Sequence, residues 1–327
     1  MKLGAVYASL VTERTLETLQ PEHLFAAAHR LGLEQIELPS RGGVSAPATG
    51  PRARGGDAPG STFVERVGEL QQRYGIGAQL GFGDRYIENG DQQPTERFAE
   101  FVERVCRPLG VRVIGTVSHL HGGRWLKEPP LDEQLDQLTA ALKRLAPVAE
   151  HTGVKIAIEN HADYRGYELA GVLARVGSRH VGARLDTGNA YCAIEEPLAA
   201  AEALAPYTMA THVKDEIVEA EPGNRGLQGG LLALRGCALG EGHVDFAAIM
   251  PLLAERGPLG NDLVLTLEVP ASSIEASIAY ARSAFAAYLQ ASRSAPSRAG
   301  TGIQAPSERG EPAPWPRATA SPSSPAG

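Results

Sequence analysis

Short apolar runs recur along the chain, and longer segments whose apolar residues have helical spacing separate them. A run of this length, bounded by Gly, Pro, Asn or Asp, predicts a buried strand. The run Ile156–Ile158 is typical, because it ends abruptly in the polar residues Glu159, Asn160 and His161. The predicted strands cover residues 3–7, 35–38, 76–80, 111–117, 156–159, 181–186, 209–213 and 263–269.

The segments between these runs predict helices. Pro21 opens the first of them, where a missing N–H costs nothing, and Gly32 ends it. Ser61 is placed to cap the second helix, and Gly75 closes it. The predicted helices cover residues 21–31, 61–74, 91–109, 131–151, 167–176, 197–205, 246–255 and 272–291.

Eight strands alternating with helices favour a parallel α/β barrel, the (β/α)8 or TIM barrel, over an open doubly wound sheet. We therefore predict one barrel domain over residues 1–291. No Gly-x-Gly-x-x-Gly follows the first strand, so a dinucleotide-binding fold lacks its main support. The apolar stripe of the helix at 272–291 predicts packing either on the barrel or on a second copy of the chain, which leaves a homo-oligomer open.

Three segments depart from the alternation. Residues 40–60 are rich in Gly, Pro and Ala, and we expect either a lid or a disordered insert. Residues 216–240 predict an irregular, Gly-rich insertion. From residue 292 to residue 327, Pro, Ser, Ala and Gly dominate without an apolar period, which predicts a disordered tail outside the fold.

Charge and cysteine content narrow the class of protein. The net charge of −7 disfavours non-specific nucleic-acid binding and is compatible with a small substrate. No apolar run is long enough to span a bilayer, and the N-terminus lacks the features of a signal peptide. We therefore expect no membrane association and a cytoplasmic protein. The odd number of cysteines without a C-x-x-C pair predicts free thiols at Cys106, Cys192 and Cys237.

Four predicted strands end in a side chain that can bind a metal ion: Glu159, Asp186, His212 and Glu268. The C-terminal strand ends of a parallel barrel face the same reaction site. Burying three carboxylates and an imidazole there without a counter-charge would cost several kcal/mol for each ion. One divalent cation removes this cost, and the mixed oxygen and nitrogen set suits Mn²⁺, Co²⁺, Mg²⁺ or Zn²⁺. The alternative is an ion-paired rim without a metal.

The segments IENHAD, LDTGNAY, THVKD, GEGHVDF and LEVP, in this order and spacing, resemble the xylose isomerase-like TIM barrel superfamily, the sugar phosphate isomerase/epimerase family. The resemblance extends over residues 3–290. It implies that Glu159, Asp186, His212 and Glu268 are the metal ligands. In the epimerase branch the two glutamates also act as the acid–base pair, so the resemblance implies that Glu159 and Glu268 are catalytic.

The resemblance implies a metal-dependent enzyme acting on a small sugar or sugar-acid substrate. An isomerase or epimerase that works through a metal-stabilised enediolate is the simplest expectation. The rival is a lyase, either a dehydratase or a decarboxylase of a 3-oxo sugar acid; the run GGLLALRGCALGEG resembles the decarboxylase-like branch. A non-catalytic sugar-binding barrel and an endonuclease IV-like DNA repair enzyme are remoter alternatives.

Five further residues are candidates for substrate contact. His161 follows Glu159 by two residues, and Lys214 follows His212 by two; Lys214 either reaches a substrate oxyanion or pairs with Asp215. Asn189 stands where the epimerases and endonuclease IV tend to carry a histidine. Glu37 and Arg184 predict a structural ion pair across the barrel interior. The substrate-contact candidates are His119, His121, His161, Asn189 and Lys214.

Overall fold

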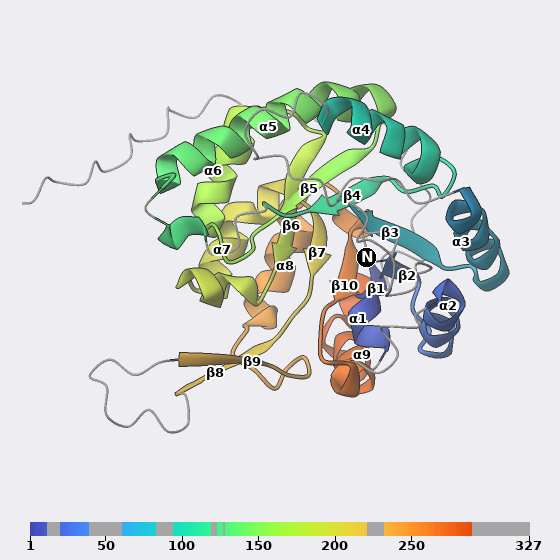
Figure 1. Cartoon of the computed structure of the whole chain (residues 1–327). Coiled ribbons are helices and arrows are strands. Elements are labelled where there is room, and N and C mark those ends of the chain that lie inside the picture. The colour runs from blue at the N-terminus through green and yellow to red at the C-terminus, as the bar shows by residue number, and fades with distance from the viewer. Residues whose placement is uncertain are drawn as a thin grey trace, which may run out of the picture. The chain divides into compact units, whose positions relative to one another are not determined.

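The computed structural model describes residues 1–11, 20–38, 61–82, 94–118, 123–126, 128–220 and 232–289. Within them, eight parallel strands form one sheet in the order β10-β1-β2-β3-β4-β5-β6-β7 (Figure 1). The strands of this sheet are β1 (Lys2–Val6), β2 (Gln35–Leu38), β3 (Gly77–Gly81), β4 (Val113–Thr116), β5 (Lys155–Glu159), β6 (Val181–Asp186), β7 (Thr208–His212) and β10 (Val264–Leu267).

The ring closes between β7 and β10. Val213 forms a parallel bridge with Leu267, its N–H donates to Thr266 O at 2.7 Å, and its carbonyl accepts from the N–H of Glu268 at 3.0 Å. Closure places the ends of β7 and β10 side by side. The predicted (β/α)8 barrel is therefore confirmed.

The barrel strands are buried on both faces, which explains their apolar character in the sequence. All six residues of β6 are buried. The eight strands predicted from the sequence are all present, and no predicted end differs from the observed one by more than two residues.

Helices cover the outside of the ring (Figure 1). Two glycines in the left-handed region end helices, Gly153 after α5 with φ 76° and Gly177 after α6 with φ 71°. The helices are α1 (Tyr7–Leu10), α2 (Pro21–Arg30), α3 (Ser61–Tyr74), α4 (Pro94–Phe101), α5 (Leu131–Thr152), α6 (Gly166–Val176), α7 (Pro197–Leu204), α8 (Phe246–Arg256) and α9 (Ile274–Ala284). None of the described helices is both long and apolar enough to cross a membrane.

The apolar stripe predicted for the last helix packs on the barrel of the same chain. Ile274, Ile278 and Phe285 are buried in its core, and Tyr280 and Tyr288 pack against that core. The apolar stripe is therefore covered by the barrel of the same chain. The prediction that the three cysteines are free thiols is also confirmed.

The helix predicted over residues 91–109 ends earlier, at Cys106, and changes type along its length. After α4 the chain forms a π-helical turn, Val102–Cys106, in which Arg107 N donates to Val102 O at 2.9 Å. Val102, Val105 and Cys106 remain buried in this turn. Apolar spacing does not distinguish an α-helical from a π-helical turn here, because both keep these residues on the core face.

The prediction of an irregular insertion over residues 216–240 is wrong for two segments, Glu216–Ala220 and Leu232–Gly236, which form strands. Strand β8 (Glu216–Ala220) pairs antiparallel with β9 (Leu232–Gly236), forming a ribbon separate from the barrel sheet. These strands, EIVEA and LALRG, lack the long apolar runs of the barrel strands, and the side chains described in them, residues 216–219 and 233–236, are half-buried or exposed. The predictions for residues 40–60 and for the tail at 292–327 lie outside the described residues.

The carboxylate of Asp215 organises the base of this ribbon. Its Oδ2 accepts from the backbone N–H groups of Gly240 at 2.8 Å and Gly242 at 3.0 Å. Its Oδ1 accepts from Glu216 at 3.0 Å and from Val244 at 3.1 Å. A Cβ at Gly242 would lie 2.2 Å from Oδ1, so this approach requires glycine.

Candidate metal centre

The four predicted ligands meet at one end of the barrel. Glu159, Asp186 and His212 are the last residues of β5, β6 and β7, and Glu268 directly follows β10. Each offers one ligand atom, and these atoms all lie within 4.8 Å of one another. The first three side chains are buried, whereas Glu268 is 35% exposed. Strand ends that face one another across a closed sheet thus form a single cluster.

Backbone and amide groups orient Asp186. Its Oδ1 accepts from the N–H groups of Gly188 and Asn189, both at 2.9 Å. The side chain of Asn160 bonds the backbone of Asp186 twice, accepting from its N–H at 2.8 Å and donating to its carbonyl at 2.9 Å. One carboxylate oxygen, Oδ2, is left facing the cluster, with Lys214 Nζ at 3.2 Å.

The imidazole of His212 is oriented from behind by Glu37. Nε2 lies 3.0 Å from Glu37 Oε2, so a hydrogen on Nε2 is donated to that carboxylate. Nδ1 then faces the other ligands, at 2.9 Å from Glu268 Oε2 and 3.5 Å from Glu159 Oε2. The sequence did not indicate that Glu37 would contact His212, because only the order of strands around the ring brings the two together.

Arg184 occupies the interior of the barrel beside the cluster. The predicted ion pair with Glu37 is confirmed, Nη1 to Oε1 at 2.9 Å, and Nη2 also binds Glu159 Oε2 at 2.5 Å. A Cβ at Gly115 on β4 would lie 2.1 Å from Nη1, so the glycine provides the space for the guanidinium. The contact with Glu159 went unpredicted, although the two residues are register partners on β5 and β6.

Burial and the neighbouring charges shift the pKa values of the three acidic ligands in different directions, up for Asp186 and down for Glu159 and Glu268. Burial raises the pKa of Asp186 to about 7, because its attraction to Lys214 is too weak to compensate. Burial also acts to raise the pKa of Glu159, but the charges of Arg184 and His212 outweigh it and lower that pKa to about 2. The pKa of Glu268 lies well below its ordinary value, since His212 and Lys214 outweigh the effect of burial.

The cluster fits a divalent cation. Asp186 Oδ2, His212 Nδ1 and Glu268 Oε2 are buried atoms without a well-formed hydrogen bond, and their polar neighbours are one another and Lys214 Nζ. A bound cation would give all three atoms a ligand bond. With His212 neutral and the acids ionised, the four carboxylates of Glu37, Glu159, Asp186 and Glu268 face the two cations Arg184 and Lys214. Two net negative charges therefore remain, and one divalent cation would neutralise them.

Without a bound cation, a proton on His212 would supply part of the missing positive charge. Burial and Arg184 act to lower the pKa of His212, but Glu37, Glu159 and Glu268 together raise it well above the ordinary value. A metal ligated by Nδ1 would displace this proton, as metal binding to imidazole generally does.

Two of the predicted substrate-contact residues lie against the ligands. Lys214 Nζ is 3.2 Å from Asp186 and 3.4 Å from Glu268, so the alternative pairing with Asp215 is wrong. Asn189 donates from Nδ2 to Glu159 Oε1 at 3.0 Å and accepts from Lys214 Nζ at 3.3 Å. Asn189 therefore connects a predicted ligand to the lysine.

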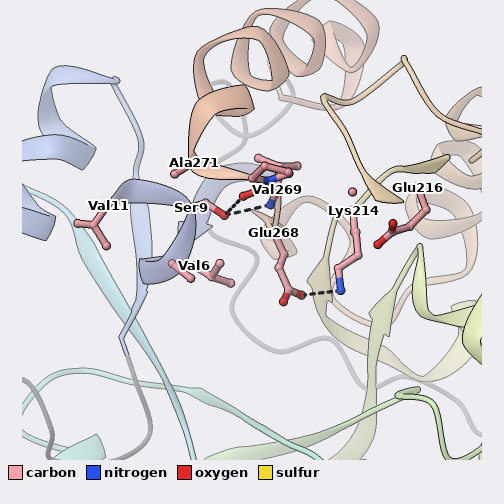
Figure 2. Close-up of a pocket in the computed structure, with 11 residues that line it drawn as sticks. Val6, Ser9, Val11, Lys214, Glu216, Glu268, Val269 and Ala271 are labelled. Atoms are coloured by element: carbon pink, nitrogen blue, oxygen red, sulfur yellow. Dashed lines mark hydrogen bonds and ion pairs between the residues drawn. The ribbon is translucent and has the colours of Figure 1, made fainter. Parts of the chain in front are cut away.

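Of the remaining candidates, only His161 lies in the part of the chain that the structure describes. His161 is half-buried in the segment that follows β5. His119 and His121 lie outside the described residues. Glu216 was not singled out from the sequence, yet together with Lys214 and Glu268 it lines a cavity of about 470 Å³ beside the cluster (Figure 2). Its position directly after the THVKD segment was the available signal.

The fold and the cluster define a (β/α)8 barrel with carboxylate and imidazole groups at the C-terminal ends of its strands. Residues 25–290 match the family model described as xylose isomerase-like TIM barrel. The chain belongs to this family.

Two curated bacterial proteins are similar to parts of the chain. The 3-oxo-isoapionate decarboxylase of Pectobacterium atrosepticum is 27% identical over 184 residues, which cover 55% of this chain and 59% of that protein. The uncharacterized protein YihM of Escherichia coli K12 is 27% identical over 136 residues, which cover 42% of this chain and 38% of that protein. The chain thus spans less than two thirds of the length of either relative.

Solved structures share the fold over nearly the whole barrel. The IOLI protein with a bound zinc atom matches with a TM-score of 0.62 at 19% identity, covering 90% of this chain and 100% of that chain. The probable 3-DHS dehydratase AsbF of Bacillus anthracis matches with a TM-score of 0.61 at 14% identity, covering 86% and 98%. An L-ribulose 3-epimerase matches with a TM-score of 0.58 at 18% identity, covering 89% and 95%.

Proposed function

We propose that this protein is a divalent-metal-dependent enzyme that forms an enediolate from a small sugar-like hydroxy-carbonyl substrate, most simply as an isomerase or epimerase. The observation that supports the proposal is the set of ligand atoms on Asp186, His212 and Glu268, which lie together with one of Glu159 within 4.8 Å of one another and lack well-formed hydrogen bonds. Glu159 completes the ligand set. The zinc atom in the IOLI protein of the same fold supports a cation at such a site.

A bound cation would stabilise the negative charge that develops on the substrate oxygens as the enediolate forms. The protein's own groups would move the protons. Glu268 lines the cavity, and it would be the carboxylate that takes a proton from the substrate carbon. Glu159 would return a proton on the opposite face. Lys214 lines the same cavity, where its ammonium would bind a substrate oxygen and balance the charge of Glu268.

Lyase chemistry is the second candidate, because Glu159 and Glu268 differ in how firmly their carboxylates are held and in how accessible they are. Arg184 at 2.5 Å and Asn189 at 3.0 Å hold both oxygens of Glu159, whereas Glu268 is 35% exposed beside the cavity. Loss of CO₂ through an enolate requires one proton transfer, to the carbon that loses CO₂, whereas epimerisation needs an acid–base group on each face of the substrate carbon. Loss of water also requires two proton transfers, one from the carbon and one to the leaving hydroxyl. The similarity to a 3-oxo-isoapionate decarboxylase favours the decarboxylase form of this alternative.

Metal analysis of the purified protein, followed by incubation with ketoses and 3-oxo sugar acids in D₂O, tests the proposal. We expect one divalent ion per chain and incorporation of deuterium next to the carbonyl of a ketose. Isomerisation conserves the mass of the substrate apart from deuterium, whereas a lyase releases CO₂ or water. A protein that binds no divalent ion, or that binds one and exchanges no proton with any of these compounds, would contradict the proposal.

A further inference from the structure

The cavity beside the metal centre has two chemically different sides. One side carries the charged groups of Lys214, Glu216 and Glu268. In Figure 2, Glu268 and Lys214 lie between Glu216 on one side and the segment of α1 on the other. The side formed by α1 and the segment after β10 consists of Val6, Ala8, Val11, Val269, Pro270 and Ala271, together with Ser9.

The hydroxyl of Ser9, on the apolar side, already makes hydrogen bonds within the protein. Ser9 Oγ donates to Val269 O at 2.8 Å and accepts from Val269 N at 3.0 Å, and the side chain is 1% exposed. Among the described residues that line the cavity, the α1 side therefore offers no free hydrogen-bonding side chain. A substrate hydroxyl placed there would exchange part of its contact with water for apolar side chains that cannot bond to it, which reduces binding.

From this contrast we infer that the cavity takes the alkyl terminus of the substrate, so that the preferred compounds are deoxy sugars or similar hydroxy-carbonyl compounds with a methyl end. The methyl end lies against Val6, Ala8 and Val11. The hydroxyls nearest the reacting carbon face Glu216 and Lys214. The inference rests on the proposed function for the position of the reacting carbon, whereas the polarity of the cavity is independent of the reaction.

The test compares ketohexoses with their 6-deoxy counterparts, fructose and tagatose in both enantiomers, on the zinc-loaded full chain. We expect kcat/KM for deuterium incorporation to be about tenfold higher for the 6-deoxy member of the pair that reacts. Two variants place a hydroxyl on the apolar side, Ala8→Ser and Val11→Thr, and each should reduce this preference about threefold. Ala276→Ser, at an exposed position of α9, is the matched control and should leave the preference unchanged.

A binding measurement separates this inference from the proposed function. Saturation-transfer NMR on the same mixtures reports whether the methyl group contacts the protein, even when no deuterium is incorporated. Methyl saturation that is weaker in Val11→Thr and unchanged in Ala276→Ser supports the subsite, even if the absence of deuterium incorporation then contradicts the proposed function. Deuterium incorporation that shows no preference for the 6-deoxy compounds overturns the subsite. The absence of both deuterium incorporation and methyl saturation also overturns it.

Discussion

The imidazole of His212 and the carboxylate of Glu37 meet across the interior of the barrel, with Nε2 and Oε2 3.0 Å apart. Their strands, β7 and β2, are not neighbours in the sheet. A histidine that donates one ring hydrogen to a carboxylate presents its other nitrogen in a fixed direction, as metal-ligating histidines generally do. The pair thus prepares Nδ1 to face Glu159, Asp186 and Glu268.

Replacing Glu37 should weaken metal binding. In Glu37→Gln the charge that orients His212 and pairs with Arg184 is lost, so the dissociation constant for Zn²⁺ or Mn²⁺ should rise about 10- to 100-fold. Competition with a chromophoric chelator measures it. Glu65→Gln, at an exposed position of α3, should bind as tightly as the wild type. An unchanged affinity in Glu37→Gln would show that the contact with His212 does not support the ligand.

A single methyl group at Gly115 should disturb the centre through Arg184. The added Cβ would lie 2.1 Å from Nη1, so Gly115→Ala should destabilise the protein by about 1–3 kcal/mol. In Gly68→Ala on α3 the nearest atom to the new Cβ is Leu109 Cδ2 at 3.9 Å, and the helix should gain about 0.5–1 kcal/mol. Urea denaturation of both variants measures the change in the free energy of unfolding. A change of the same sign in the two variants would contradict the proposed clash with Arg184.

Removing the charge of either glutamate should stop turnover while the fold survives. Glu159→Gln and Glu268→Gln keep the shape of the side chain but lose the proton-transferring group, and we expect a rate reduction of about 10²- to 10⁴-fold or more. Deuterium incorporation measures the rate, and circular dichroism checks the fold. Glu255→Gln, exposed on α8, serves as the control. A glutamine variant with a rate near that of the wild type would refute the catalytic assignment.

Asp215 should be required for the order of the β8–β9 ribbon. In Asp215→Asn one carboxylate oxygen becomes an NH₂ group, which cannot accept from the backbone N–H groups that Asp215 now binds. We expect a loss of about 1–3 kcal/mol and faster hydrogen exchange at Gly240, Gly242 and Val244. Mass spectrometry of exchange localises the effect. Asp262→Asn, at an exposed position, should leave these amides protected. Equal protection in both variants would be inconsistent with this role.

The barrel strands were predictable because each is buried on both faces and is bounded by turn residues. Their sequence pattern is therefore local, and strands such as Val181–Asp186 match the expected ends. The β8–β9 ribbon was missed because Glu216–Ala220 has only two consecutive large apolar residues between glutamates, which is too short a run to distinguish a strand from a loop. The π-helical turn at Val102–Cys106 was missed because its core-facing residues also suit an α-helix.

The sequence by itself determined the alternation of strands and helices and the kinds of side chain at the strand ends, including Glu159, Asp186, His212 and Glu268. These features depend on residues within one element. Only the tertiary structure decided that Arg184 binds Glu159 and that Glu37 orients His212, a partner 175 residues away in the chain. Such contacts depend on strand order, register and closure of the ring, which arise only when all the strands pack together.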